Sequence, residues 1–272
     1  IDLRAVWVNT FLPDSLGLAS GLLTSNLDIE TALTENNKLD TSATEVTGTA
    51  YFKEGEFLTS VLSQPVEDIS SRLVFKGQRV ELEETGLRLD DVVLTASGDV
   101  DVEDGYDITA QIPSISLLQI ERIADVELPD TIDGSFRLNT QLAGELESPE
   151  VRGKLFNLLP VVVDRLSIET VAADFDLTPE RLDLTELRIV PEAGGRIVAE
   201  GNADLTELDT LPFELMAQAS GVPADVYAQI YNVSLPPEIA IGTLSAELDA
   251  IGTLKEQTAY VAWQLTESTY PG

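Results

Sequence analysis

Apolar and polar residues alternate in Leu182-Asp183-Leu184-Thr185-Glu186-Leu187-Arg188-Ile189. Successive side chains of a β-strand point to opposite faces of a sheet, so a period of two predicts a strand with one apolar and one solvated face. The same period occurs in residues 80–83, 87–90 and 99–102. The sequence therefore predicts an all-β fold.

Short glycine-containing segments punctuate these stretches, at residues 84–86, 103–105 and 193–195. Glycine adopts positive φ readily, so these segments predict hairpins that make neighbouring strands antiparallel. Two stretches have helical character, residues 114–123 and 224–231, and each follows a proline. We expect short helices that plug the end of a curved sheet and bury Leu117, Leu118, Ile120, Val226 and Ile230.

A longer pattern recurs three times: a short helix, a Leu-Pro pair, and a glycine that opens a strand. Its glycines are Gly21, Gly134 and Gly242, which lie 113 and 108 residues apart. Stacked repeats of this kind cover one another's ends. The predicted organisation is the end of a preceding repeat with a short helix at 1–20, repeat units at 21–133 and 134–241, and the start of a third repeat at 242–272.

A sheet with one apolar face must hide that face in a barrel, a sandwich or a trough. The repeat favours an elongated, curved antiparallel sheet that forms a U-shaped trough with an apolar interior, because ordinary sandwiches do not repeat in this way. With roughly nine strands at about 4.8 Å spacing, one repeat extends the trough by on the order of 40 Å. The alternative is that the apolar residues pack on one another as a sandwich core.

The predicted lining of the trough is the apolar set that alternates with the charged residues. No charged residue falls within this set, and none of its members is expected to be catalytic. The members are Leu73, Phe75, Val80, Leu82, Leu87, Leu89, Phe136, Leu138, Leu155, Leu166, Ile168, Phe175, Leu177, Leu182, Leu184 and Ile189.

The composition argues against several classes of function. The net charge is −32, and because the charges fall singly between apolar residues they predict a solvated face. Such a surface repels phosphate backbones and anionic headgroups, so we expect no nucleic-acid partner and only apolar contact with lipids. The chain has no histidine and no cysteine. It therefore lacks serine–histidine and cysteine–histidine catalysis and the usual zinc ligands, and we predict no enzyme activity, cofactor or metal.

One segment, Asp99–Gly105, superficially resembles a calcium loop. Its glycine is at the seventh position, and Ala110 stands where a bidentate glutamate is required, so we set calcium aside. The sequence starts at Ile1 with no basic leader, and no run of 18 apolar residues occurs. We expect a segment of a longer protein whose anchor and targeting signal lie elsewhere.

The second repeat contains a recognisable motif in three stretches: Gly134-Ser135-Phe136-Arg137-Leu138, Leu142-Ala143-Gly144-Glu145-Leu146 and Ser148-Pro149-Glu150-Val151-Arg152-Gly153. The third repeat keeps part of this motif but has Lys255-Glu256-Gln257-Thr258 in place of Ser-Pro. The motif resembles that of the TamB family, the translocation and assembly module proteins of bacterial envelopes, which are part of an AsmA-like superfamily.

The resemblance implies an inner-membrane anchor, a long periplasmic body of curved sheet with an apolar groove, and a carboxy-terminal end that meets an outer-membrane barrel protein of the Omp85 type. Family members are associated with phospholipid movement to the outer membrane and with insertion of outer-membrane proteins. The acidic composition would suit a cyanobacterial member.

The sequence thus supports two functions from different classes. The first is a periplasmic segment that shields phospholipid acyl chains in a groove between the inner and outer membranes. The second is a scaffold or chaperone that helps outer-membrane proteins insert, or proteins translocate, by offering sheet edges for β-strand augmentation. An acidic spacer that binds neither lipid nor peptide is a third reading.

Overall fold

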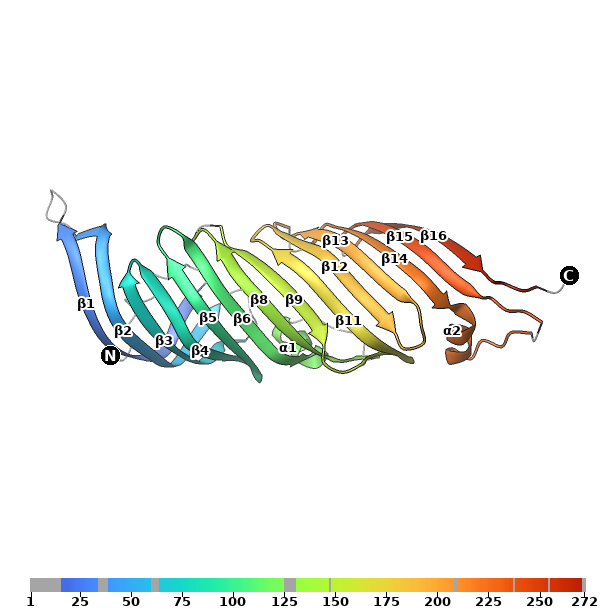
Figure 1. Ribbon diagram of the computed structural model, residues 1–272, viewed down its shortest axis with the longest axis horizontal. Coiled ribbons are helices and arrows are strands. Elements are labelled where there is room, and N and C mark those ends of the chain that lie inside the picture. The colour runs from blue at the N-terminus through green and yellow to red at the C-terminus, as the bar shows by residue number, and fades with distance from the viewer. Residues whose placement is uncertain are drawn as a thin grey trace. The chain divides into compact units, whose positions relative to one another are not determined.

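The computed structural model describes residues 16–33, 39–59, 64–124, 131–146, 148–207, 210–236, 238–253 and 255–270. Over these residues the fold is all-β, as predicted, with two short helices and sixteen strands in one antiparallel sheet (Figure 1). The strand order starts at β1 and ends at β16, which do not pair with each other. The chain divides into two compact units, and each is described by itself.

The first unit comprises Ile1–Glu127 and Asn139–Pro149. Its strands pair in chain order, and the later part of β8 belongs to it. Its elements are β1 (Leu16–Leu33), β2 (Leu39–Thr59), β3 (Val66–Gly77), β4 (Arg79–Leu89), β5 (Val92–Asp101), β6 (Gly105–Ser116), α1 (Leu117–Ala124) and β8 (Ser135–Gly144).

The second unit comprises Leu128–Leu138 and Glu150–Gly272, so it includes the start of β8. Its order is β9-β11-β12-β13-β14-β15-β16, while β10 pairs with β7 and β11 beside this path. Its elements are β7 (Ile132–Asp133), β9 (Glu150–Asn157), β10 (Val161–Val163), β11 (Leu166–Leu177), β12 (Arg181–Pro191), β13 (Arg196–Asp204), β14 (Phe213–Pro223), α2 (Ala224–Ile230), β15 (Thr243–Gly252) and β16 (Gln257–Thr266).

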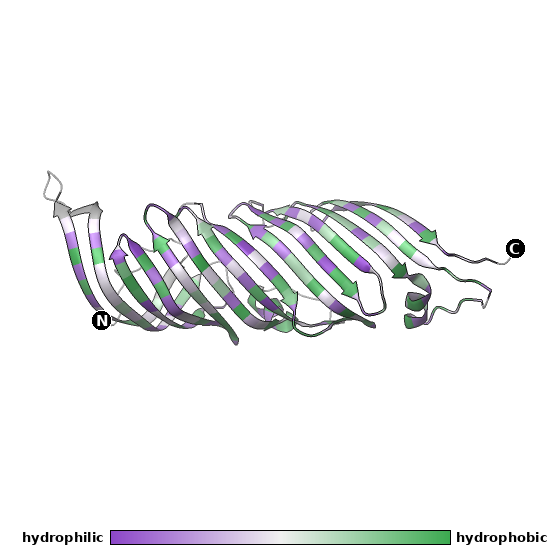
Figure 2. Ribbon diagram, in the orientation of Figure 1, coloured by the Kyte–Doolittle hydropathy of each residue, from purple (hydrophilic) through white to green (hydrophobic). Residues whose placement is uncertain are grey.

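The pairing register separates each unit into an apolar face and a charged face. In the first unit one row across β2 to β6 consists of Ala50, Leu73, Leu82, Gly98 and Ile108. The neighbouring row, one residue away along each strand, is mostly polar or charged. Apolar and polar bands accordingly alternate along the strands in Figure 2. We call these the inner face and the outer face.

A line of β-bulges crosses β2, β3 and β4. The register shifts at Glu54, Asp68 and Glu84, each of which has positive φ and an exposed side chain. Each bulge inserts one extra residue on the outer face, so the apolar residues on both sides of it keep the inner face. A bulge also bends its strand and increases the local twist. The bulges therefore account for the curvature of this sheet.

The bulges correct one sequence prediction. Residues 84–86 do not form a hairpin turn, because β4 runs through them as a single strand. The other two predicted turns are confirmed: residues 103–105 lie where β5 passes to β6, and residues 193–195 lie between β12 and β13. The alternation in residues 182–189 also contains a bulge, since Leu184 and Leu187 face the same side across a register shift.

Each repeat contains fewer strands than expected. Among the described residues β9 is the sixth strand after β2 in sheet order and β16 is the sixth after β9, so the expectation of roughly nine is wrong. The division between the two units falls within β8, close to the predicted start of the second repeat at Gly134. The repeat boundaries themselves stay a prediction, and most of the segment at 1–20, with its helix, lies outside the described residues.

The two predicted helices are confirmed as α1 and α2. Helix α1 follows β6 directly, and α2 follows β14 directly. Side chains of α1 contact the β4–β5 hairpin, and a side chain of α2 contacts the β12–β13 hairpin. Gln119 and Arg122 of α1 bond to Asp91 at 2.8 and 2.9 Å, and the Tyr227 hydroxyl of α2 donates to the carbonyl of Gly194 at 3.0 Å. The prediction that Leu118 and Val226 are buried is wrong, because these side chains are 66% and 40% exposed.

Candidate functional site

In the first unit the predicted lining residues lie together on the inner face. Leu73 is opposite Leu82, and Phe75 is opposite Val80. Beyond the bulge, Leu87 and Leu89 return to the same face, opposite residues 94 and 92 of β5. The structure brings these six predicted residues onto one continuous apolar surface of β3 and β4.

In the second unit the predicted residues also share one face. Phe175 lies opposite Leu184, and Leu177 lies opposite Leu182. Leu155 and Ile189 reach this face through register with β11. Leu166 and Ile168 face residues 163 and 161 of β10, and Phe136 and Leu138 lie on the face of β8 opposite the exposed Arg137.

The inner faces contain residues that the sequence analysis did not single out. In the first unit they include Val92, Leu94, Val100, Tyr106 and Ile108, and in the second unit Leu215 and Leu248. Their alternation was visible in the sequence, as in Glu214-Leu215-Met216, but exposed apolar residues on the outer face obscured it. Only the pairing register separates the two sets.

One polar pair lies on the inner face of the first unit. The hydroxyls of Ser71 and Thr85 are buried and are 2.6 Å apart, so one donates a hydrogen bond that the other accepts. Both residues adjoin the bulges of β3 and β4. A buried hydroxyl with a partner contributes little net polarity, so this pair leaves the face effectively apolar.

The inner faces are shielded but not covered. Within the described residues no large side chain is fully buried, and the predicted lining residues are half-buried except for Phe136 and Ile168, which are 5% and 6% exposed. A sandwich core buries its large apolar side chains completely. The described residues therefore do not form a closed core over these faces.

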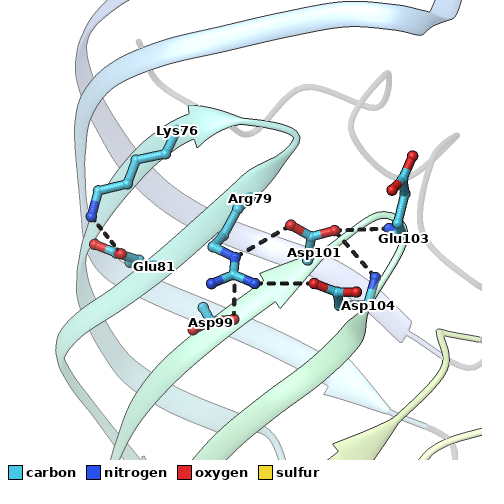
Figure 3. Close-up of polar contacts among 7 residues, drawn as sticks. All are labelled: Lys76, Arg79, Glu81, Asp99, Asp101, Glu103 and Asp104. Carbon is cyan, nitrogen blue, oxygen red and sulfur yellow. Dashed lines mark hydrogen bonds and ion pairs between the residues drawn. The ribbon is translucent and has the colours of Figure 1, made fainter.

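The outer faces carry the charges as cross-strand ion pairs. Arg72 pairs with Glu83 in the first unit, and Lys154 pairs with Asp174 at 3.6 Å in the second. At the β5–β6 turn, Arg79 lies among Asp99, Asp101 and Asp104 (Figure 3). Pairs between exposed charges add little stability. Because these charged side chains all lie on the outer face, that face is solvated and the inner face carries no charge.

The turn that resembles a calcium loop is occupied by protein donors. Asp101 accepts hydrogen bonds from the backbone N–H groups of Glu103 and Asp104 at 2.9 and 3.2 Å (Figure 3). These bonds, followed by the bond from Arg79, lower the pKa of the Asp101 carboxyl. The equivalent Asp204 has its pKa lowered by the side chain and backbone N–H of Thr206. Both carboxylates act as turn caps.

The outer face also has shallow depressions. One of about 290 Å³ is lined by Thr185, Glu200, Met216, Glu247 and Asp249, together with residues 198, 199, 217, 218 and 248. None of the sixteen predicted lining residues borders it. This depression is therefore separate from the predicted lining.

Among the described helices none has the length and apolar character needed to cross a membrane. Comparison of the chain with protein-family models, with curated proteins and with solved structures found no match.

Proposed function

We propose that the inner faces hold the alkyl chains of phospholipids, and that the chain is a periplasmic segment of a longer protein that carries these lipids from the inner to the outer membrane. The observation that supports this most is the distribution of charge. At the paired inner-face positions of β3 to β6 and of β11 to β15 there is no charged residue, although the chain has a net charge of −32.

An uncovered apolar face can shield the alkyl chain of a lipid from water. Exposing one chain of about sixteen carbons to water costs on the order of 12 kcal/mol, at roughly 0.8 kcal/mol per methylene. Contact with half-buried side chains such as Leu73, Leu82 and Phe175 replaces much of that exposure. Because the side chains are all apolar and of similar chemistry, a chain can slide along them without a deep trap.

The headgroup is expected to stay in solvent. Basic side chains such as Arg72, Lys154 and Arg188 lie on the outer face, where each is near a carboxylate. No cation faces the alkyl chains at the paired inner positions, so the site offers no pocket for a phosphate. We therefore propose low selectivity among headgroups.

The rest of the proposal follows from the resemblance to the TamB family. An inner-membrane anchor and contact with an Omp85-type barrel protein of the outer membrane belong to the longer protein in this proposal. Neither feature is required for the lipid-binding test that follows.

The test measures lipid that purifies with the protein from a bacterial host. Mass spectrometry of extracted lipid is compared between the wild-type chain and the variant Phe175→Glu with Leu184→Glu, which places two charges at one inner-face pair. The control is Met216→Glu with Ile251→Glu. It adds the same charge at outer-face residues that are 53% and 54% exposed.

We expect phospholipid in the wild type and in the outer-face control, and at least a tenfold loss in the inner-face variant. Circular dichroism establishes that all three chains are folded. Absence of lipid from the folded wild type contradicts the proposal, and so does equal lipid in the inner-face variant.

The alternative function, a scaffold for outer-membrane strands, requires an open sheet edge. One observation favours it, since the residues of β16 are exposed along nearly its whole length. Strand peptides that bind equally to the wild type and to the inner-face variant, with no lipid in either, would favour the scaffold.

A further inference from the structure

Apolar side chains are exposed on the outer face of β13, β14 and β15. Met216 of β14 is 53% exposed, and Ile251 of β15 is 54% exposed. Val198 of β13 faces the same side and is half-buried. Each of these three strands is paired on both of its sides, so this surface lies within the sheet and not at its edge.

The pairing register places these apolar residues on one diagonal. Val198 lies opposite Gln218, which is two residues along β14 from Met216. Met216 lies opposite Asp249, which is two residues along β15 from Ile251. Diagonal neighbours of this kind are about 7–8 Å apart and within reach of long side chains. Val198, Met216 and Ile251 therefore form an apolar line across three strands, which we call the apolar diagonal.

The surface is hollowed on both sides of Met216. The depression of about 290 Å³ described above has Val198 and Met216 in its lining, and a second one of about 280 Å³ has Met216 and Ile251. Each depression therefore lies between two successive members of the apolar diagonal. Exposed apolar patches with a polar rim are typical of protein interaction sites, and large apolar side chains of a partner can fill both depressions.

Carboxylates lie on both sides of the apolar diagonal. Glu200 and Glu214 lie on one side of it, and Glu247 and Asp249 lie on the other. All four side chains are exposed. None of the four forms an ion pair among the described residues. The diagonal is therefore an apolar line between two rows of unpaired negative charge.

The neighbouring strands β11 and β12 have cations beside their carboxylates. Asp174 pairs with Lys154 at 3.6 Å, and Glu186 pairs with Arg188 at 3.1 Å. From β13 to β16 the only basic residue within a strand is Arg196, and it pairs with Glu186 at 3.9 Å. The four carboxylates around the diagonal thus lack the cations that their neighbours have.

We propose that the apolar diagonal and its four carboxylates bind a basic amphipathic helix of another protein. An apolar stripe flanked by lysine or arginine on both sides complements an apolar line flanked by carboxylates on both sides. Residues i and i+4 of a helix are about 6 Å apart along its axis, so two apolar side chains of the partner can occupy the two depressions.

A second copy of this chain does not meet the requirement. Copies with a net charge of −32 repel each other. Most of the described basic side chains are already in ion pairs within the chain. The cations must therefore come from a different protein. This inference is independent of the proposed lipid function, because lipid is proposed for the inner face.

The probe is a synthetic peptide, Ala-Lys-Leu-Lys-Ala-Lys-Leu-Ala-Gln-Leu-Lys-Ala-Lys-Leu-Lys, whose leucines form one helical stripe with lysines on both sides. One control peptide has the same composition with its leucines spread around the helix. A second control has glutamate in place of every lysine.

Binding to the full chain is followed by nuclear magnetic resonance of the methionine methyl group at about physiological salt, where surface charge is partly screened. Met216 is the only methionine of the chain, so isotope labelling of that methyl group reports on the diagonal itself. We expect the striped peptide to shift this signal saturably, the rearranged peptide to bind at least tenfold more weakly, and the acidic peptide not to bind. Absence of a shift with the striped peptide, or equal affinity for the rearranged one, overturns the proposal.

Two charge variants separate local contact from the field of the whole chain. Glu200→Gln with Asp249→Asn removes one carboxylate from each side of the diagonal, and we expect it to weaken binding at least fivefold. Glu169→Gln with Glu180→Gln removes the same charge at exposed residues outside this surface, and we expect it to weaken binding less than twofold. Equal weakening by the two variants contradicts the proposed site.

One further variant tests the apolar contact. Ile251→Thr keeps the branched shape and the charge but replaces apolar atoms with a hydroxyl, so we expect at least threefold weaker binding, with circular dichroism establishing that the variant is folded. Unchanged binding contradicts the role of the diagonal. A shift of the Met216 signal on concentrating the chain alone would assign the surface to a second copy. A shift with phosphatidylcholine vesicles and not with the peptide would assign it to a membrane, and either result overturns the proposal.

Discussion

The inner faces contain two kinds of region that are equally free of charge but are built from side chains of different size. Across β3 and β4 the opposed pairs are large, with Leu73 beside Leu82 and Phe75 beside Val80. Across β13 and β14 each pair contains a small residue, with Ala199 beside Ala217 and Gly201 beside Leu215. The two regions therefore keep the same polarity while their volumes differ. The difference follows the position in the sheet, because the strands after β9 repeat the order, with large pairs across β11 and β12 and smaller ones across β13 and β14.

This difference separates two requirements that coincide in a closed core. A packed interior must match both polarity and volume, because empty space and excess volume are each destabilising. An uncovered face needs only to exclude charge, since solvent or a mobile ligand fills the remaining space. The small residues of β13 and β14 occupy less volume on the inner face than the large residues of β3 and β4.

The largest expected effect comes from placing a charge on each inner face. We expect Leu82→Glu to reduce the free energy of unfolding by about 2–3 kcal/mol, because it removes a half-buried leucine and desolvates a carboxylate. Ala217→Glu is expected to cost about 1 kcal/mol, since little packing is lost. Urea unfolding of both variants measures the difference, and an equal loss would break the contrast between these two regions.

A smaller effect is expected from adding volume. Ala50 is 1% exposed in the first unit, so Ala50→Leu should overpack its surroundings and cost about 1–3 kcal/mol. Ala217 is half-buried between residues 199 and 248, so Ala217→Leu should change stability by less than about 0.5 kcal/mol. If the space above Ala217 holds alkyl chains, this variant should also retain less lipid.

A still smaller effect is expected from the two equivalent turn caps, Asp101 and Asp204. The pKa of each carboxyl is lowered in the folded state, for Asp101 by the N–H groups of residues 103 and 104 and then by Arg79, and for Asp204 by Thr206. A lowered pKa contributes stability that is present above the unfolded value of about 3.9 and is lost as the pH falls through the folded value.

Stability should therefore fall below about pH 4, and Asp101→Asn and Asp204→Asn should each weaken this dependence. Added salt should reduce the effect of Asp101→Asn more, because only Asp101 accepts a hydrogen bond from an arginine. Carboxyl chemical shifts measured between about pH 2 and 5 check the direction of both pKa shifts. A pKa above the ordinary value at either residue would contradict the cap.

The sequence predicted the all-β fold, the two helices and the antiparallel hairpins because each has a local signal. The bulge at Glu84 was mistaken for a turn, since Glu-Thr-Gly has the composition of a turn and only the pairing partners show that the strand continues. The exposure of Leu118 could not be predicted, because it depends on which side of α1 packs against the sheet.

The predicted lining residues do share one face in each unit, since alternation assigns residues to faces directly. Their role as a lipid surface stays a prediction. The exposure of β16 was not anticipated, although its lack of charge is visible in the sequence. Charge alone does not indicate whether a strand is central or terminal, and only the strand order does.

The central claim is that lipid contacts the inner faces and not the outer faces. Its most direct test replaces one aromatic residue at a time with photoreactive benzoylphenylalanine: Phe75 and Phe175 on the inner faces, Tyr51 and Tyr260 on the outer faces. After irradiation of the purified chains, mass spectrometry identifies adducts. We predict phospholipid adducts at Phe75 and Phe175 and none at the tyrosines, which are 45% and 73% exposed. Equal adducts at all four positions, or none at the phenylalanines, would contradict the account.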